Sequence, residues 1–167
     1  MYQVHKKEKA PMPSIYSIVY QPKDQKYVER QDAFIRVPTQ QAQLIAGYGI
    51  EGDQKGGHDP LRQLNILSHE WLLTQHPKGY KTQPGQFGEQ IILAGLAVES
   101  LEPGARLQLG NEAQIEIAKL RMPCERLQAA QGKSIEDLGP VGMLAKVIIG
   151  GLIRVGDEVT IPEIIKT

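Results

Sequence analysis

The chain has 167 residues, with 19 basic and 19 acidic side chains and therefore no formal net charge. This balance disfavours nucleic-acid binding, which usually needs a basic excess, and no apolar run approaches the roughly 18 residues of a membrane helix. A single cysteine excludes an internal disulfide and a four-cysteine zinc site, and with no apolar leader near the N-terminus we expect a cytoplasmic protein.

The length fits a single domain, which we place at residues 13–167 behind a flexible lead at residues 1–12. The hydrophobic and charged fractions, 41% and 23%, are those of a globular protein, and this composition disfavours global disorder. Gly and Pro number 17 and 11 and are spread along the chain, as expected for many short strands separated by turns.

Short apolar or alternating runs bounded by turn residues predict a series of strands. In chain order they lie at residues 15–19, 26–37, 44–50, 63–67, 87–93, 106–109, 113–120, 144–149, 152–155 and 158–161. The alternation is clearest at 113–120, where Ile115, Ile117 and Lys119 share one face. The Gly150-Gly151 pair predicts a hairpin turn between 144–149 and 152–155.

Two helices are expected between the strands. Ser68 is a candidate N-cap for a helix that carries Trp71 and ends near His76, and a second helix is expected at about 125–130. Eight to ten short strands with two or three short helices favour a mostly β fold. We predict a closed or partly closed β-barrel, because closure removes exposed strand edges.

Cys124 is the first candidate for chemistry. It follows proline at the end of a predicted strand and precedes a predicted helix, with Arg121 and Arg126 close by in the sequence. Oriented helix N–H groups and cationic neighbours both favour the thiolate form of a cysteine. The alternative is a small buried core thiol, because free cysteines are often buried.

Two glycine-rich segments are weaker candidates. The loop that begins at Gly49 carries Asp53, Lys55, His58 and Arg62, and these cations could bind an anion such as phosphate. It lacks the glycine-lysine-serine/threonine ending of a nucleotide-binding P-loop. In the segment 84–89, Glu89 beside two glycines could act as a base or orient a ligand. Each segment could equally be a surface turn.

Taken in order, four blocks of the sequence resemble the MOSC domain, named for the C-terminal part of molybdenum-cofactor sulfurases. The blocks are Gly49-Ile-Glu-Gly-Asp53 with His58 and Arg62, then Pro84-Gly-Gln-Phe-Gly-Glu89 with Gly95-Leu96, then Met122-Pro123-Cys124, and finally residues 145–158. The resemblance spans about residues 45 to 161. It departs from the family pattern after Asp53, where Gln54-Lys55 replace Arg-His, and at Gln90, which replaces Asn.

The resemblance implies a barrel of the pyruvate-kinase type and a bound molybdenum cofactor, molybdopterin. It implies that Cys124 either ligates the molybdenum or carries sulfur as a persulfide. Candidates to bind the cofactor are Asp53, Lys55, His58, Arg62, Glu89, Arg121 and Arg126. No residue supports a pyridoxal phosphate site.

Two functions follow from the resemblance. In the first, the protein is a molybdenum-dependent oxidoreductase that reduces N-hydroxylated compounds with electrons from a redox partner, because the chain has no ferredoxin-type cysteine set. In the second, it is a sulfur carrier that takes sulfur from a cysteine desulfurase and delivers it to a cofactor or metal–sulfur centre. The expected partners are thus a small-molecule cofactor and one of these proteins, with no nucleic acid and no membrane. A structural barrel with an inert thiol is the third interpretation.

Overall fold

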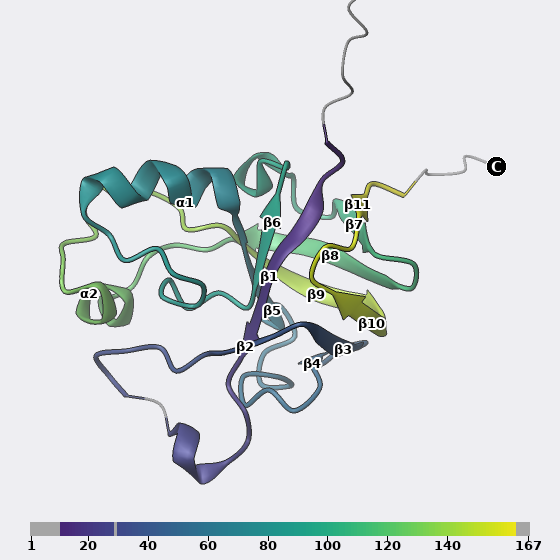
Figure 1. Cartoon of the computed structure of the whole chain (residues 1–167), viewed down its shortest axis with the longest axis horizontal. Helices are drawn as coiled ribbons and strands as arrows, with labels where there is room; N and C mark the ends of the chain where they lie inside the picture. The colour runs from purple at the N-terminus through teal and green to yellow at the C-terminus, as the bar shows by residue number, and fades with distance from the viewer. Residues whose placement is uncertain (1–10, 29, 163–167) are drawn as a thin grey trace, which may run out of the picture.

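The computed structural model describes residues 11–28 and 30–162 of the chain (Figure 1). Most of the predicted N-terminal lead lies outside the described residues. Within them, the structure has eleven strands, two short α-helices and three single-turn 3-10 helices. The predicted mostly β class with a few short helices is therefore confirmed.

The main sheet has eight strands in the order β11-β7-β8-β9-β5-β6-β1-β2. Its strands are β1 (Ser14–Tyr20), β2 (Val37–Thr39), β5 (Leu64–Ser68), β6 (Ile91–Ala94), β7 (Arg106–Leu109), β8 (Ala113–Leu120), β9 (Met143–Ile149) and β11 (Val159–Thr160). All neighbouring pairs are antiparallel except β5 and β6, which run parallel. A second sheet contains β10 (Gly151–Arg154), β3 (Gln41–Ile45) and β4 (Gly49–Ile50), in that order.

The segment at β11, one end of the main sheet, meets the first residues of β1 near Ser14. An isolated antiparallel bridge joins Ser14 to Glu158, and the Ile15 N–H donates to the Asp157 carbonyl at 2.9 Å. The Val159 N–H donates to the Pro13 carbonyl at 2.8 Å. Because β11 has only two residues, the described residues of β1 and β11 do not form a continuous ladder of paired residues. Full closure of the barrel therefore stays a prediction.

The two α-helices lie to the left of the strands in Figure 1, whereas the short helix at residues 25–27 lies at the bottom of the view. The helices are α1 (His69–Gln75), α2 (Glu125–Gln131), η1 (Gln25–Tyr27), η2 (His76–Lys78) and η3 (Val98–Ser100). Ser68 caps α1 as predicted, because its hydroxyl accepts a hydrogen bond from the Trp71 N–H at 3.4 Å. No helix in the described part of the chain is both long enough and apolar enough to cross a membrane.

Buried apolar side chains form two cores. The larger core is formed by side chains of the strands, with Ile115 and Ile117 of β8 buried on one face as predicted. Lys119 leaves that face because the register of β8 against β9 shifts between Ile117 and Lys119. The smaller core contains Leu72 of α1 and Leu127 of α2, and Phe87 is fully buried in it. The segments around Phe87 and α2 are thus held in one apolar cluster.

The strand predictions at 26–37 and 44–50 were partly wrong. In the first stretch, Asp24 caps η1 by accepting from the Lys26 N–H at 3.1 Å, and strand structure starts only at Val37. In the second, a turn at Gly47, with φ of 73°, divides the stretch into β3 and β4, which pair as a hairpin. The turn forms there because glycine adopts a positive φ without steric cost.

The predicted hairpin around Gly150-Gly151 was wrong. β9 pairs with β8 and β5 in the main sheet, whereas β10 pairs with β3 in the other sheet. A Cβ on Gly150 would lie 2.7 Å from the Leu44 carbonyl oxygen, so this glycine marks a close approach to β3. The glycine pair therefore carries the chain from one sheet to the other.

The strand predicted at 87–93 begins only at Ile91. Residues before it form turns in which Gly85 and Gly88 have positive φ values of 90° and 79°. These turns contact the last residue of α2, Gln131, and they carry much of the candidate site.

Candidate functional site

Cys124 is the N-cap residue of α2 and is exposed to solvent. Its backbone is extended, with φ of −130° and ψ of 168°, and its carbonyl accepts a hydrogen bond from the Gln128 N–H at 3.2 Å. Extended backbone at this position directs the chain from β8 into the helix. The alternative of a buried core thiol is therefore wrong, and Cys124 is open to reagents and partners.

Arg121 lies three residues before Cys124 and is buried, with 8% of its surface exposed. Its Nη1 donates to the Phe87 carbonyl at 2.6 Å. Burial lowers the pKa of Arg121 to about 10, while the charges of Glu89 and Cys124 act in the opposite direction. At neutral pH the guanidinium is still cationic, so a positive charge is held next to Cys124.

Glu89 is fully buried in the turn whose Phe87 carbonyl accepts the hydrogen bond from Arg121. Its carboxylate accepts hydrogen bonds from the Gly85 N–H at 2.6 Å and from the Phe87 N–H at 3.3 Å. Burial raises the pKa of Glu89 to about 7, against these two hydrogen bonds and the charge of Arg121. Glu89 therefore shapes the turn from inside, and its direct contact with a cofactor stays a prediction.

Side chains from several segments contact Gly88. A Cβ on this residue would lie 2.9 Å from two ring atoms of Phe34 and 3.0 Å from Nη2 of Arg121. The Gly88 carbonyl also accepts from Nη2 of Arg36 at 3.3 Å. The guanidinium of Arg126 lies 4.8 Å from the centre of the Phe34 ring. Arg36, Arg121 and the Phe34 ring thus contact Gly88, and Arg126 lies over that ring.

Phe34 and Arg36 were missed as site residues from the sequence. They lie in the 26–37 stretch that was predicted to be a plain polar strand. The only signal was a phenylalanine two residues before an arginine, which is common in strands and carries no specific meaning. Their role depends on contacts with Gly88 and Arg126, which are distant in the sequence: Gly88 lies 52 positions after Arg36, and Arg126 lies 92 positions after Phe34.

Asp53 is fully buried and connects three segments. Its side chain accepts from the Gln21 N–H at 3.1 Å, the Lys55 N–H at 3.3 Å and Nε2 of Gln90 at 3.4 Å. Oε1 of Gln90 in turn accepts from the Asn65 N–H at 2.7 Å. The residue that departs from the family pattern, Gln90, therefore has a defined place as the link between Asp53 and β5.

The remaining predicted residues lie on the loop after Asp53. Arg62 is exposed, and its charge acts on buried Arg121 in the same direction as that of Arg36. His58 is exposed and its Nε2 lies 2.9 Å from the Gln54 carbonyl of its own loop. Lys55 is half-buried. Binding roles for Arg62, His58 and Lys55 all stay predictions.

The C-terminal end of α2 is fastened by Gln131, which is 4% exposed. Its Oε1 accepts from the Lys81 N–H at 2.7 Å, and its Nε2 donates to the carbonyls of Lys81 at 3.0 Å and Gln86 at 3.1 Å. One side chain therefore satisfies three backbone groups of the segment that leads into the Glu89 turn. This contact ties α2 to that turn.

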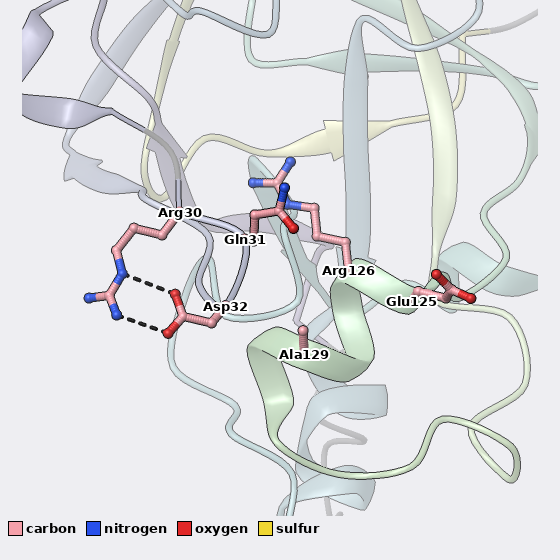
Figure 2. A pocket seen from close by; sticks show the side chains of 6 residues that line it. All are labelled: Arg30, Gln31, Asp32, Glu125, Arg126 and Ala129. Carbon is pink, nitrogen blue, oxygen red and sulfur yellow. Dashed lines mark hydrogen bonds and ion pairs between the residues drawn. The ribbon is translucent and has the colours of Figure 1, made fainter.

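A cavity of about 610 Å³ opens beside α2 (Figure 2). Figure 2 shows that Arg126 and Gln31 extend toward each other across it, while Arg30 and Asp32 form an ion pair of 2.9 Å at its side. Its lining residues are Arg30, Gln31, Asp32, Glu125, Arg126 and Ala129. One of these lining residues, Glu125, directly follows Cys124 in the sequence. Among the described residues, no three His, Cys, Asp or Glu side chains form a group that could hold a metal ion.

Together these features define a class of protein: a mostly β scaffold that presents an exposed thiol beside a group of arginines. A family model for the MOSC domain matches residues 56–160, which is more than half of the chain. The chain therefore belongs to the MOSC domain family, and the resemblance noted from the four sequence blocks is confirmed.

Solved structures share the fold of this chain. The crystal structure of YiiM from Geobacillus stearothermophilus is 22% identical, with a TM-score of 0.66 over 90% of this chain and 75% of that chain. YiiM from Escherichia coli is also 22% identical, with a TM-score of 0.66 over 94% and 73%. The YuaD protein from Bacillus subtilis is 20% identical, with a TM-score of 0.68 over 89% and 94%. At these identities the likeness concerns the fold alone. A comparison with curated proteins gave no match.

Proposed function

We propose that this MOSC protein binds a molybdenum cofactor and that Cys124 is the protein ligand of the molybdenum. The observation that carries the proposal is the exposed thiol of Cys124 next to the buried, cationic Arg121. MOSC domains are generally linked to the molybdenum cofactor, which supports the choice of ligand. A thiolate is a soft ligand of the kind that such a metal accepts.

The residues present fit such a group. A pterin cofactor carries a phosphate, and planar guanidinium groups bind phosphate through paired hydrogen bonds. Arg36, Arg121 and Arg126 surround the Gly88–Phe34 contact and would hold the phosphate. Asp53 and Glu89 would act indirectly, by fixing the loops on which these groups stand. Lys55, His58 and Arg62 are further candidates from the neighbouring loop.

When bound, the cofactor would supply two-electron redox chemistry at the metal. The chain itself would provide the thiolate ligand, the cations that orient the phosphate, and the cavity beside α2 as a place for a small substrate. We propose a molybdenum-dependent oxidoreductase that reduces N-hydroxylated compounds, with electrons supplied by a redox partner at the exposed side of Cys124. The alternative is a sulfur carrier.

The exposure of Cys124 supports the alternative as well, because sulfur transfer requires direct access of a partner's persulfide. In that reaction the Cys124 thiolate attacks the outer sulfur of the desulfurase persulfide. A new S–S bond forms on Cys124, and the desulfurase thiolate leaves with the electron pair of the broken bond. No external oxidant or reductant is needed.

The test is to replace Cys124 with alanine and to express both proteins in a host that makes the molybdenum cofactor. We expect the wild type to contain about one molybdenum and one pterin per chain, and Cys124→Ala to lose the metal, because no other thiolate is available in a chain with one cysteine. Metal analysis and released pterin are the measurements. Met122→Ala, which removes an exposed side chain beside the thiol, is the control and should keep the metal.

Two results would contradict the oxidoreductase. If Cys124→Ala keeps as much molybdenum as the wild type, Cys124 is not the ligand. If neither protein holds molybdenum and the wild type gains 32 Da of persulfide sulfur, about the mass of one sulfur atom, after incubation with a cysteine desulfurase, the carrier function is supported instead.

A further inference from the structure

The ring of Phe34 carries two cations. The guanidinium carbon of Arg126 lies 4.8 Å from the ring centre, and that of Arg36 lies 5.5 Å from it. Both distances are within the roughly 6 Å over which the negative face of an aromatic ring attracts a cation. Phe34 is therefore in contact with arginines from two segments of the chain, its own and α2.

The ring is itself held firmly. Two of its atoms face the bare Cα of Gly88, where a Cβ would come within 2.9 Å. The same ring packs against the smaller apolar core, which includes Leu127 of α2. The Phe34 ring is thus held by backbone on one side and by core side chains on another. A ring held in this way can fix the positions of the Arg36 and Arg126 guanidiniums that contact it.

Such a fixed ring is needed because the cations repel one another. Burial is the main cause of the lowered pKa of Arg121, and the positive charges of Arg36 and Arg62 lower it further. The ring quadrupole offsets part of that repulsion for Arg36 and Arg126 without neutralising their charge. Both guanidiniums therefore remain charged while they contact the same ring.

We propose that Phe34 is a positioning residue that sets the places of Arg36 and Arg126 for an anionic group bound beside Cys124. In the proposed function, on which this inference rests, the anionic group is the phosphate of the cofactor. Phe34 itself does not touch the reacting atoms. Its contribution is the arrangement of the positive charge next to the thiol.

The experiment compares the alkylation of Cys124 by iodoacetate, which is an anion, with alkylation by neutral iodoacetamide. Cys124 is the single cysteine, so the label reports one site. The ratio of the two rates measures the positive field at the thiol and is unaffected by a general change in thiol exposure. It is measured on cofactor-free protein at low ionic strength, where charges are least screened.

The sharpest variant replaces Phe34 with pentafluorophenylalanine, which keeps the ring and its packing but reverses its quadrupole. We expect the iodoacetate-to-iodoacetamide ratio to fall by about threefold to tenfold in this variant and in Phe34→Leu, since a partly exposed cation–π contact has about that effect. The control is Tyr27→Leu, which removes the contact of Lys26 with the Tyr27 ring, 5.1 Å apart, outside the arginine group. It should keep the wild-type ratio.

A wild-type ratio in both Phe34 variants would overturn the inference, whatever the metal content of the wild type. A lowered ratio in the Phe34 variants, combined with a wild type that binds no pterin, would support the role of Phe34 toward anions and reject the proposed cofactor. A lowered ratio in Tyr27→Leu as well would show that the effect is not specific to Phe34 and would also overturn the inference.

Discussion

Replacing Gly88 with alanine is expected to lower the free energy of unfolding by about 3 kcal/mol. Part of this is the cost of a side chain at φ of 79°, about 1 to 2 kcal/mol for a left-handed residue. The rest comes from overpacking, about 1 to 3 kcal/mol, because the new Cβ would lie within 3.0 Å of both the Phe34 ring and Nη2 of Arg121. Urea unfolding at neutral pH measures the change.

Gly132→Ala is the matched control for Gly88→Ala. Gly132 also has a positive φ, 64°, but a Cβ there would meet nothing within 4 Å. It should therefore lose only about 1 to 2 kcal/mol, the backbone part of the cost. Equal losses in the two variants would mean that Phe34 and Arg121 do not pack against Gly88, and the central contact of the site would be wrong.

The second large effect is on the pH dependence of stability. Burial raises the pKa of Glu89 from 4.5 to about 7, so the folded protein binds this proton more tightly than the unfolded chain. The resulting stabilisation is fully present below pH 4.5 and is lost as the pH rises through 7. A shift of this size corresponds to about 3 kcal/mol.

Glu89→Gln removes this titration. We expect its unfolding free energy to lack the fall of about 3 kcal/mol between pH 4.5 and 7 that Glu89 gives the wild type. At pH 4.5 the variant should be the less stable protein by about 1 to 2 kcal/mol, because its amide nitrogen cannot accept from one of the two backbone N–H groups.

Urea midpoints across this pH range, converted to free energies, are the measurement for Glu89. Glu99→Gln, which changes an exposed carboxyl, is the control and should follow the wild-type curve. A difference between wild type and Glu89→Gln that stays constant from pH 4.5 to 7 would show that Glu89 does not carry the raised pKa.

The local elements could be predicted where the side-chain pattern and the caps agree. The alternation at 113–120 predicted β8, and Ser68 predicted the start of α1, because both depend on residues a few positions apart. The Gly150-Gly151 pair failed because its short-range signal is the same for a hairpin and for a crossing between two sheets. Only the pairing of β10 with β3 distinguishes them.

The candidate site was predicted in part for the same reason. Cys124, Arg121 and Arg126 are close in sequence, and family motifs pointed to Glu89. The contribution of Phe34 and Arg36 depends on the packing of one segment over Gly88, which no local pattern encodes. The sequence shows a glycine at position 88, but it does not show why a glycine is needed there. The structure explains it, because a side chain at this position would meet the ring of Phe34.

The contact made by Gln131 has a consequence for local motion. Because its amide is bonded to the backbone of Lys81 and Gln86, α2 cannot separate from that segment without breaking three hydrogen bonds at once. The two should open together, as one cooperative unit in native-state hydrogen exchange. The Lys81 N–H would then exchange at the rate of the α2 amides, and Cys124 would share the opening equilibrium of the turn that holds Glu89.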